Sequence, residues 1–263
     1  MNFDFSSIKV LLIGDFMIDH YIMGTSNRLS PEAPAPVVIP DKEYSIPGGS
    51  GNVAMNLSNM GAQVTCAGSV GNDDWGKQLF SIFKKKGIGT DYIYIPDNHP
   101  TTLKQRIYSN GEQVVRIDKE TYFDLYSHNQ NQTKEIDYKE YDVIIISDYN
   151  KGTINNIKSI NADMVIVDPK KDNFSLYKNA HIITPNLNEL QRATQIEIKN
   201  DQSIVYACNE LIENNNLNYI VAKKGNKGLT IVGRDNFFKH IEAQFVENPD
   251  VTGAGDTVVA VLS

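Results

Sequence analysis

Val10-Leu11-Leu12-Ile13-Gly14-Asp15 is an apolar run that ends in a glycine and an acid. Such a run is typical of a parallel strand that is buried on both faces. Similar runs, several ending in Asp, Ser, Thr or Lys, recur at residues 64–70, 143–148, 164–168, 182–184 and 219–223. Because ligands of open α/β sheets bind at the carboxyl ends of the strands, these polar residues predict one shared cleft. The alternative is that each of them only caps the helix that follows.

Helical patterns lie between these strands, at residues 52–60, 74–86, 187–194 and 203–214. Alternating strands and helices predict the α/β class, with a doubly wound, mostly parallel sheet and helices on both faces. A chain of 263 residues is long enough for one such domain with a substantial core, so we expect a single domain over residues 1–263.

Two regions break this rhythm, because residues 37–44 and 101–118 alternate between apolar and polar side chains. Ser109-Asn110-Gly111-Glu112, within the second region, is a hairpin signal. We expect a small antiparallel β lid, with its strands within about 16–47 and 100–118, that closes over a bound sugar. The alternative is an ordinary edge hairpin. The polar stretch 125–139 predicts a surface helix and loop.

The octapeptide Asp250-Val251-Thr252-Gly253-Ala254-Gly255-Asp256-Thr257 precedes an apolar helical run. Its glycines predict a turn that opens into a helix N-terminus, where unpaired amides and the helix dipole favour an anion. Beside such an anion site, Asp256 can take the proton from an attacking hydroxyl, as phosphoryl transfer requires. The alternative is a tight turn in which Asp256 only caps the helix.

Two further motifs open helices. Pro47-Gly48-Gly49-Ser50-Gly51-Asn52 predicts a glycine-rich loop whose amides approach a ligand, with Asn52 offering a donor and an acceptor to sugar hydroxyls. Thr184-Pro185-Asn186-Leu187-Asn188-Glu189 follows a strand, and Asn186 and Glu189 share one face of the first helical turn. They can hold Mg²⁺ through water and position nucleotide phosphates. The alternatives are a bare turn and a simple helix cap.

Composition excludes several classes of function. The net charge is −7 and no segment carries a basic stripe, so we expect no nucleic-acid partner. No stretch is long enough to span a membrane, and the start of the chain lacks the pattern of a signal peptide. Cys66 and Cys208 stand far apart, which favours free thiols and a cytoplasmic location. The histidines lack metal-ligand spacing, and no Walker A motif is present.

Taken together, these motifs resemble the ribokinase-like (PfkB) carbohydrate kinases, in the right order over nearly the whole chain. The matching features are Gly48-Gly49 with Asn52, the Asn186-x-x-Glu189 motif and Gly253-Ala254-Gly255-Asp256. Within that family, four segments resemble the D-glycero-β-D-manno-heptose-7-phosphate kinases of lipopolysaccharide precursor synthesis: Gly14 to Tyr21, Arg28 to Pro34, Ser147 to Gly152 and Asp168 to Lys170. Ser30-Pro31-Glu32-Ala33-Pro34 is the least generic of these.

The resemblance implies a ribokinase-like fold, ATP and Mg²⁺ as cofactors, and a role for each matching residue. Asp256 would be the catalytic base, with an anion hole from the amides of Gly253, Ala254 and Gly255. The ATP-Mg²⁺ side would be lined by Asn186, Leu187, Asn188 and Glu189, with Lys223, Gly225 and Gly228 near the nucleotide. Sugar hydroxyls would be held by Asp15, Gly48, Gly49, Asn52 and Asp148. Candidates for the substrate's phosphate are Lys104, Arg106 and Lys170, because cations on lid and strand ends are needed there; the alternative for Lys104 and Arg106 is a solvated lid face.

The resemblance also implies a reaction, the phosphorylation of the heptose 7-phosphate at O1 to the 1,7-bisphosphate, and a possible homodimer through the lid strands. Members of the family continue for several helices beyond the catalytic aspartate, whereas this sequence ends at Ser263. We therefore expect a truncated gene, a partial sequence or a trimmed domain. The alternatives are a kinase for another sugar, such as ribose, fructose or a fructose phosphate, and an inactive remnant.

Overall fold

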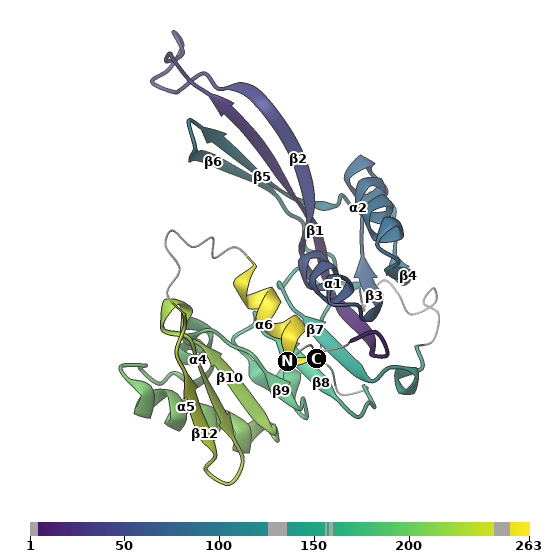
Figure 1. The fold of residues 1–263 in the computed structure, drawn as a ribbon, viewed down its shortest axis with the longest axis vertical. Coiled ribbons are helices and arrows are strands. Elements are labelled where there is room, and N and C mark those ends of the chain that lie inside the picture. The colour runs from purple at the N-terminus through teal and green to yellow at the C-terminus, as the bar shows by residue number, and fades with distance from the viewer. Residues whose placement is uncertain (1–4, 126–135, 156, 158–159, 245–252) are drawn as a thin grey trace.

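The structure, a computed structural model, describes residues 5–125, 136–155, 157, 160–244 and 253–263. Its main sheet has the strand order β12-β11-β10-β9-β8-β7-β1-β3-β4 (Figure 1). All neighbours from β4 to β10 are parallel, and only β11 and β12 are antiparallel to the strands they pair with. The strands of this sheet are β1 (Lys9–Thr25), β3 (Gln63–Ser69), β4 (Gly89–Tyr94), β7 (Val143–Ser147), β8 (Val165–Asp168), β9 (Ile182–Ile183), β10 (Tyr219–Lys223), β11 (Leu229–Gly233) and β12 (Phe238–Ile241).

The central strands are apolar because both of their faces are covered. Ile144 and Ile146 of β7 enter one core cluster and Ile145, between them, enters the other. The first cluster lies under α4 (Leu187–Thr194), α5 (Asp201–Asn215) and the 3-10 turn Phe174–Tyr177. The second lies under α1 (Ser50–Asn59), α2 (Asp74–Lys85) and α6 (Ala254–Leu262). The predicted doubly wound sheet with helices on both faces is confirmed.

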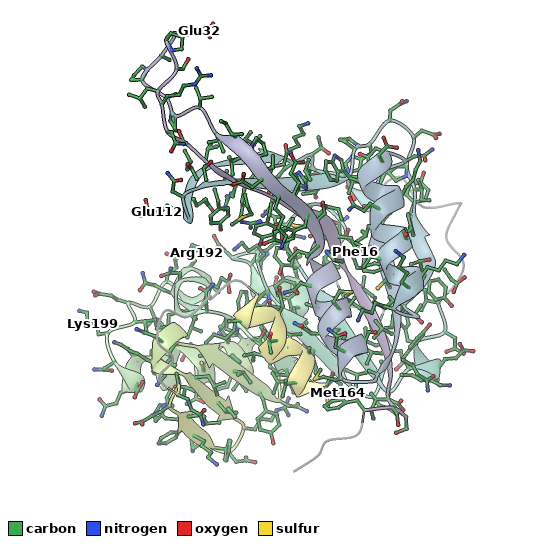
Figure 2. All side chains as sticks on the ribbon, turned by 45° about the horizontal axis from the view of Figure 1, so that its top comes forward. Phe16, Glu32, Glu112, Met164, Arg192 and Lys199 are labelled. Carbon is green, nitrogen blue, oxygen red and sulfur yellow. The ribbon has the colours of Figure 1, made fainter. Side chains whose placement is uncertain are left out.

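The lid stands off the main sheet as a second, four-strand layer in the order β2-β1-β5-β6. Its strands are β2 (Ile39–Gly49), the outer half of β1, β5 (Thr102–Ser109) and β6 (Glu112–Lys119). Figure 2 shows Phe16 where β1 leaves the main sheet, with Glu32 at the far tip of the lid and Glu112 at the tip of the β5–β6 hairpin. That hairpin turns at Asn110 and Gly111, which both have positive φ, as the sequence signal predicts.

Two local expectations were wrong. The strand predicted to end at Asp15 continues without a break to Thr25, so a single strand belongs to both sheets. The glycine-rich segment is not a loop: Gly48 and Gly49 end β2, and α1 begins directly at Ser50. The lid is therefore joined to the main sheet by β1 itself and to α1 without a linker. The prediction for residues 125–139 falls largely outside the described residues.

Helix ends follow the capping residues in the sequence. Asp73 accepts a hydrogen bond from the Gly76 amide at the start of α2, and Asn200 with Ser203 forms a capping box at the start of α5. Both cysteines are buried and unpaired, and burial raises the pKa of the Cys208 thiol to about 12. Within the described part of the chain, no helix has the length and hydropathy needed to cross a bilayer.

Candidate active site

Asp256 lies in the first turn of α6, and its side chain is held by two donors from distant parts of the chain. Nδ2 of Asn52, on α1, donates to Oδ2 at 2.7 Å, and the hydroxyl of Tyr149 donates to Oδ1 at 2.6 Å. Burial raises the pKa of this carboxyl, and the two hydrogen bonds oppose that rise. The structure therefore presents an oriented carboxylate with an elevated proton affinity, which suits a general base.

The backbone before Asp256 favours glycine. Gly253 has φ of 74°, in the left-handed region, and a Cβ added there would clash with Nδ2 of Asn52. The turn thus brings the start of α6 against α1. The first amides of α6, at the predicted anion hole Gly253 to Gly255, lie at a helix N-terminus that has no side-chain cap.

A cation lies beside this helix start. A Cβ added to Gly255 would lie 3.3 Å from Nζ of Lys223, which is the last residue of β10. Nζ of Lys223 also pairs with Oδ1 of Asp168 at the end of β8, at 2.5 Å, and the same oxygen accepts a hydrogen bond from Thr184. The charges of Asp168 and Lys223 act in opposite directions on the pKa of Asp256. Lys223, predicted near the nucleotide, is therefore positioned next to the anion hole.

The Asn186–Glu189 pair forms a capping box. Oδ1 of Asn186 accepts from the Glu189 amide, and Oε2 of Glu189 accepts from the Asn186 amide, both at 2.9 Å. The alternative raised from the sequence, a helix cap, is thus present, and it uses one oxygen of Glu189. The other oxygen, Oε1, lies 3.6 Å from Nζ of Lys170, whose side chain is half exposed. The roles of Leu187 and Asn188 toward a nucleotide stay predictions.

The donor set suits a magnesium ion carried mainly by phosphates. Glu189 is almost fully buried yet keeps Oε1 free of the capping box, and a hard, hydrated cation takes one or two carboxylates together with substrate phosphates. Among the described residues, no group of three or more His, Cys, Asp or Glu side chains is arranged to hold a metal ion. Glu189 through water therefore stays the predicted magnesium contact.

The predicted phosphate-binding cations of the lid each have a carboxylate partner. Nη1 of Arg106 lies 2.5 Å from Oδ1 of Asp19, and both side chains are largely buried. Nζ of Lys104 lies 3.4 Å from Glu120, whose other oxygen accepts a hydrogen bond from Lys151 at 2.6 Å. Lys104 and Arg106 are thus not a solvated lid face, and a substrate phosphate would share them with Asp19 and Glu120.

Two carboxylates predicted to hold sugar hydroxyls already accept hydrogen bonds from the protein, and their contact with a sugar stays a prediction. Asp15 accepts from the backbone amides of Tyr149, Lys151 and Thr153, at 2.8, 3.1 and 3.2 Å. Asp148 has no exposed side-chain surface, and its oxygens accept from the Tyr177 hydroxyl and the Asn150 amide. Both carboxylates were singled out because they end strands, and they serve to hold the loop that follows β7.

The contacts predicted for Gly48, Gly49, Gly225 and Gly228 with the sugar or the nucleotide stay predictions. Gly225 begins the 3-10 turn Gly225–Lys227 after β10, and Gly228 follows it against the backbone of Ile241. Gly48 lies against the carboxylate of Asp19, and Gly49 against Met17. Nδ2 of Asn52 donates to Asp256, and the predicted contact of Asn52 with a sugar hydroxyl stays a prediction.

Three residues of the site had no role assigned from the sequence. Asp19 lies four positions after Asp15 on the same face of β1, a spacing that could have indicated it. Asp168 and Tyr149 lie inside segments recognised as motifs, at the end of β8 and after β7. Nothing in the local pattern indicates that the Tyr149 hydroxyl reaches Asp256, because the two residues are 107 positions apart.

Comparisons with known proteins identify the family and the fold. Residues 7–263 match the pfkB family carbohydrate kinase family. The bifunctional protein HldE of Aliarcobacter butzleri is 37% identical over 269 residues, covering 97% of this chain and 56% of that protein. The bifunctional protein HldE of Histophilus somni is 34% identical, covering 98% of this chain and 56% of that protein. The chain spans about half the length of these curated relatives.

Solved structures share the fold at low sequence identity. Phosphofructokinase-2 from Escherichia coli in complex with substrates and products has a TM-score of 0.75 and 19% identity, covering 96% of this chain and 84% of that one. Arabidopsis thaliana ribokinase complexed with ribose and ATP has a TM-score of 0.70 and 19% identity, covering 96% and 83% of the two chains. The fold is thus ribokinase-like.

Proposed function

The chain belongs to the pfkB family of carbohydrate kinases, and from this premise we propose that it phosphorylates D-glycero-β-D-manno-heptose 7-phosphate at O1 with ATP, giving the 1,7-bisphosphate. The sugar is proposed from the resemblance of residues 14–21 and 28–34 to heptose kinases, and the relatives named HldE support it. The reaction would supply a precursor of ADP-heptose for lipopolysaccharide synthesis, in the cytoplasm.

The chemistry starts at Asp256. Its carboxylate takes the proton of the sugar O1 hydroxyl while O1 attacks the γ-phosphorus in line. The bond from the γ-phosphorus to its bridging oxygen breaks, and ADP leaves with that electron pair. The proton stays on Asp256 until the product departs. The raised pKa of this buried carboxyl makes it a stronger base than an exposed aspartate.

The residues around Asp256 stabilise the charge on the phosphoryl group. The amides of Gly253, Ala254 and Gly255 would donate to the developing anion at the start of α6, and Lys223 would add a positive charge beside Gly255. A magnesium ion, held by Glu189 through water, would neutralise the nucleotide phosphates when bound. Asn186, Leu187 and Asn188 would line the nucleotide side, with Gly225 and Gly228 close to it.

The lid supplies the sugar side. Arg106, Lys104 and, from the main domain, Lys170 would hold the 7-phosphate, since a phosphate dianion binds most strongly to several cations. Gly48, Gly49 and Asp19 would contact the sugar hydroxyls under the lid. Closure of the lid would exclude water, so that ATP is not hydrolysed.

The observation that carries this proposal is the buried Asp256 carboxylate in the first turn of α6, which follows the glycine turn at Gly253 and has Lys223 beside Gly255. The test is ADP release with ATP, Mg²⁺ and heptose 7-phosphate. Asp256→Asn should lower kcat by at least about a hundredfold while the Kd for ATP is unchanged. Asp172→Asn, at an exposed aspartate paired with Arg192, is the control and should keep kcat.

A panel of ribose, fructose and fructose 1-phosphate decides the sugar. If one of these has a higher kcat/KM than the heptose 7-phosphate, the chain is a kinase for that other sugar. If Asp256→Asn keeps kcat, the assignment of the base is wrong. Absence of turnover on all of these sugars would favour the inactive alternative.

The possible homodimer through the lid is supported by exposed apolar side chains. Val115 and Ile117 on β6 and Ile46 on β2 each expose about two fifths of their surface. We expect sedimentation equilibrium to give a dimer, and Ile117→Lys to give a monomer of the same thermal stability. A wild-type chain that sediments as a monomer at micromolar concentration would contradict this expectation.

A further inference from the structure

We propose that Tyr149 is a positioning residue for the general base: its hydroxyl, together with Asn52, holds the Asp256 carboxylate in one orientation and links it to the loop after β7. The inference rests on the proposed function, because it assigns a residue that acts on the catalytic base. Neither the motif analysis nor the similarity to other kinases indicates this role.

The geometry of the contact is the first support. Tyr149 binds Oδ1 of Asp256 at 2.6 Å, and Asn52 binds the opposite oxygen, Oδ2, at 2.7 Å. With a donor on each oxygen, rotation of the carboxyl group about its terminal bond would break one hydrogen bond or the other. Each oxygen keeps a further lone pair, so the carboxylate can still accept the proton of a sugar hydroxyl.

The second support is the anchoring of Tyr149 itself. Its backbone amide donates to Asp15 at 2.8 Å, and the amides of Lys151 and Thr153 donate to the same carboxylate. Tyr149 thus joins two buried aspartates, one through its amide and one through its hydroxyl. Asp15 lies in β1, at the point where this strand passes from the main sheet to the lid.

The other end of this loop is equally constrained. Gly152 has φ of 108°, and a Cβ there would clash with the carbonyl of Phe123, whose amide in turn donates to the Lys151 carbonyl. Asp148 accepts from the Asn150 amide at 2.6 Å. A tyrosine on a loop with so many backbone hydrogen bonds has little freedom, so its hydroxyl is a fixed point for Asp256.

The electrostatics make Tyr149 a permanent donor. Burial and the neighbouring charge of Asp256 raise the pKa of Tyr149 far above its ordinary value, so its hydroxyl keeps its proton at every pH used for assay. The charged groups that act on Asp256 from the neighbouring elements are Asp168 of β8, which raises its pKa, and Lys223 of β10, which lowers it. The hydrogen bond from Tyr149 also lowers it, so its removal should raise the pKa of Asp256.

The test is the pH dependence of kcat. The base must be ionised, so kcat falls on the acid side as the pH drops through the pKa of Asp256 in the complex. In Tyr149→Phe we expect this acid limb to move to higher pH by about one unit, the size expected for one hydrogen bond to a charged group. The KM for ATP should not change, because the substitution leaves the nucleotide side intact.

A matched control is available in the same fold. Tyr177, which is fully buried, donates to Asp148 at 2.6 Å, so Tyr177→Phe deletes a phenol-to-carboxylate hydrogen bond of the same length as that of the partly buried Tyr149. Tyr177→Phe should lower the thermal midpoint by an amount similar to Tyr149→Phe but leave the acid limb of kcat where it is. An equal shift of the limb in both variants would reduce Tyr149 to a general structural role and overturn the proposal.

A second substitution guards against a Tyr149→Phe protein that fails to fold. Replacing Tyr149 by 3-fluorotyrosine keeps the shape of the ring and makes the hydroxyl a stronger donor. The acid limb should then move to lower pH, opposite to the shift in Tyr149→Phe. An acid limb identical to wild type with fluorotyrosine at this position would refute the positioning role.

The failure of this inference can be told apart from failure of the proposed function. If Asp256→Asn is inactive and both Tyr149 variants keep the wild-type acid limb, the kinase assignment stands and the role of Tyr149 is wrong. If Asp256→Asn keeps its turnover, the titration of the Asp256 carboxyl is followed by infrared difference spectroscopy instead. A carboxyl pKa that is the same in wild type and in Tyr149→Phe would then overturn the inference without any assay of activity.

Discussion

Gly253→Ala tests the active-site geometry with a single methyl group. The backbone at Gly253 has φ of 74°, and placing alanine in the left-handed region costs about 1 kcal/mol. The new Cβ would also clash with Nδ2 of Asn52, the atom that donates to Asp256. Loss of that hydrogen bond to a carboxylate adds about 1.5–3 kcal/mol, so the free energy of unfolding should fall by roughly 2.5–4 kcal/mol in total.

The measurement is the thermal midpoint of Gly253→Ala, compared with that of a control variant in which the added methyl group causes backbone strain but no side-chain clash. Gly87 has φ of 69°, and a Cβ there would have no neighbour within 4 Å. Gly87→Ala should therefore lose only about 1 kcal/mol, or about 2–4 °C for a chain of this size, against roughly 5–15 °C for Gly253→Ala. The difference between the two variants measures the contact with Asn52.

A double variant isolates the contact further. Asn52→Ala removes the side chain that the new methyl group would strike, so Gly253→Ala in that background should cost only the backbone term. The acid limb of kcat should move to higher pH in Gly253→Ala, because Asp256 loses a hydrogen bond that lowers its pKa. Equal losses of stability in Gly253→Ala and Gly87→Ala, or strict additivity with Asn52→Ala, would refute the reasoning.

Three other predictions concern charges. Lys223→Met should lower kcat by about a hundredfold or more, because it removes the cation beside the predicted anion hole. The control Lys224→Met, at the next residue, should keep kcat, and an equal loss of kcat in both variants would contradict the assignment. Arg106→Ala should raise the KM for the sugar 7-phosphate by about ten- to a hundredfold, and an equal rise in the KM for ATP would show that Arg106 does not bind the sugar phosphate. The hydrogen bond from Lys151 keeps the pKa of Glu120 below its usual range, so this carboxylate stabilises the fold above the unfolded pKa and loses that effect as the pH falls through the folded pKa. The thermal midpoints of wild type and Glu120→Gln should therefore differ at pH 7 and become equal near pH 3. A difference that persists near pH 3 would contradict the linkage.

The core strands could be predicted because burial on both faces leaves a continuous apolar run. Residues 143–148 and 219–223 formed strands within one residue of the predicted ends, and α4 matched its predicted range, since Asn186 and Glu189 form a strong local helix start. The short antiparallel strands β11 and β12 were not predicted. The side chains of β12 are exposed, so its sequence carries no apolar pattern.

The extension of β1 shows where local pattern reaches its limit. Residues 16–25 remain extended after Asp15 because β2 and β5 pair with them on both sides, and those partners lie 14 to 33 residues away in β2 and 85 residues away in β5. The hydrogen-bond partners of Asp15 and Asp148 could not be predicted for a related reason. Both are polar residues at strand ends, but the amides that donate to Asp15 come from the loop after β7, and the tyrosine that donates to Asp148 comes from the 3-10 turn Phe174–Tyr177.

The sequence by itself determined the alternation of strands and helices, the glycine turn before Asp256 and the family to which they point. These features depend on backbone propensity, capping and periodicity, which act over a few neighbouring residues. Only the tertiary structure decided which side chains surround the base, because Asn52 and Tyr149 lie 204 and 107 positions from Asp256 and meet it through the packing of α1, α6 and the loop after β7. The pKa of Asp256 is likewise a tertiary property, since burial and long-range partners set it.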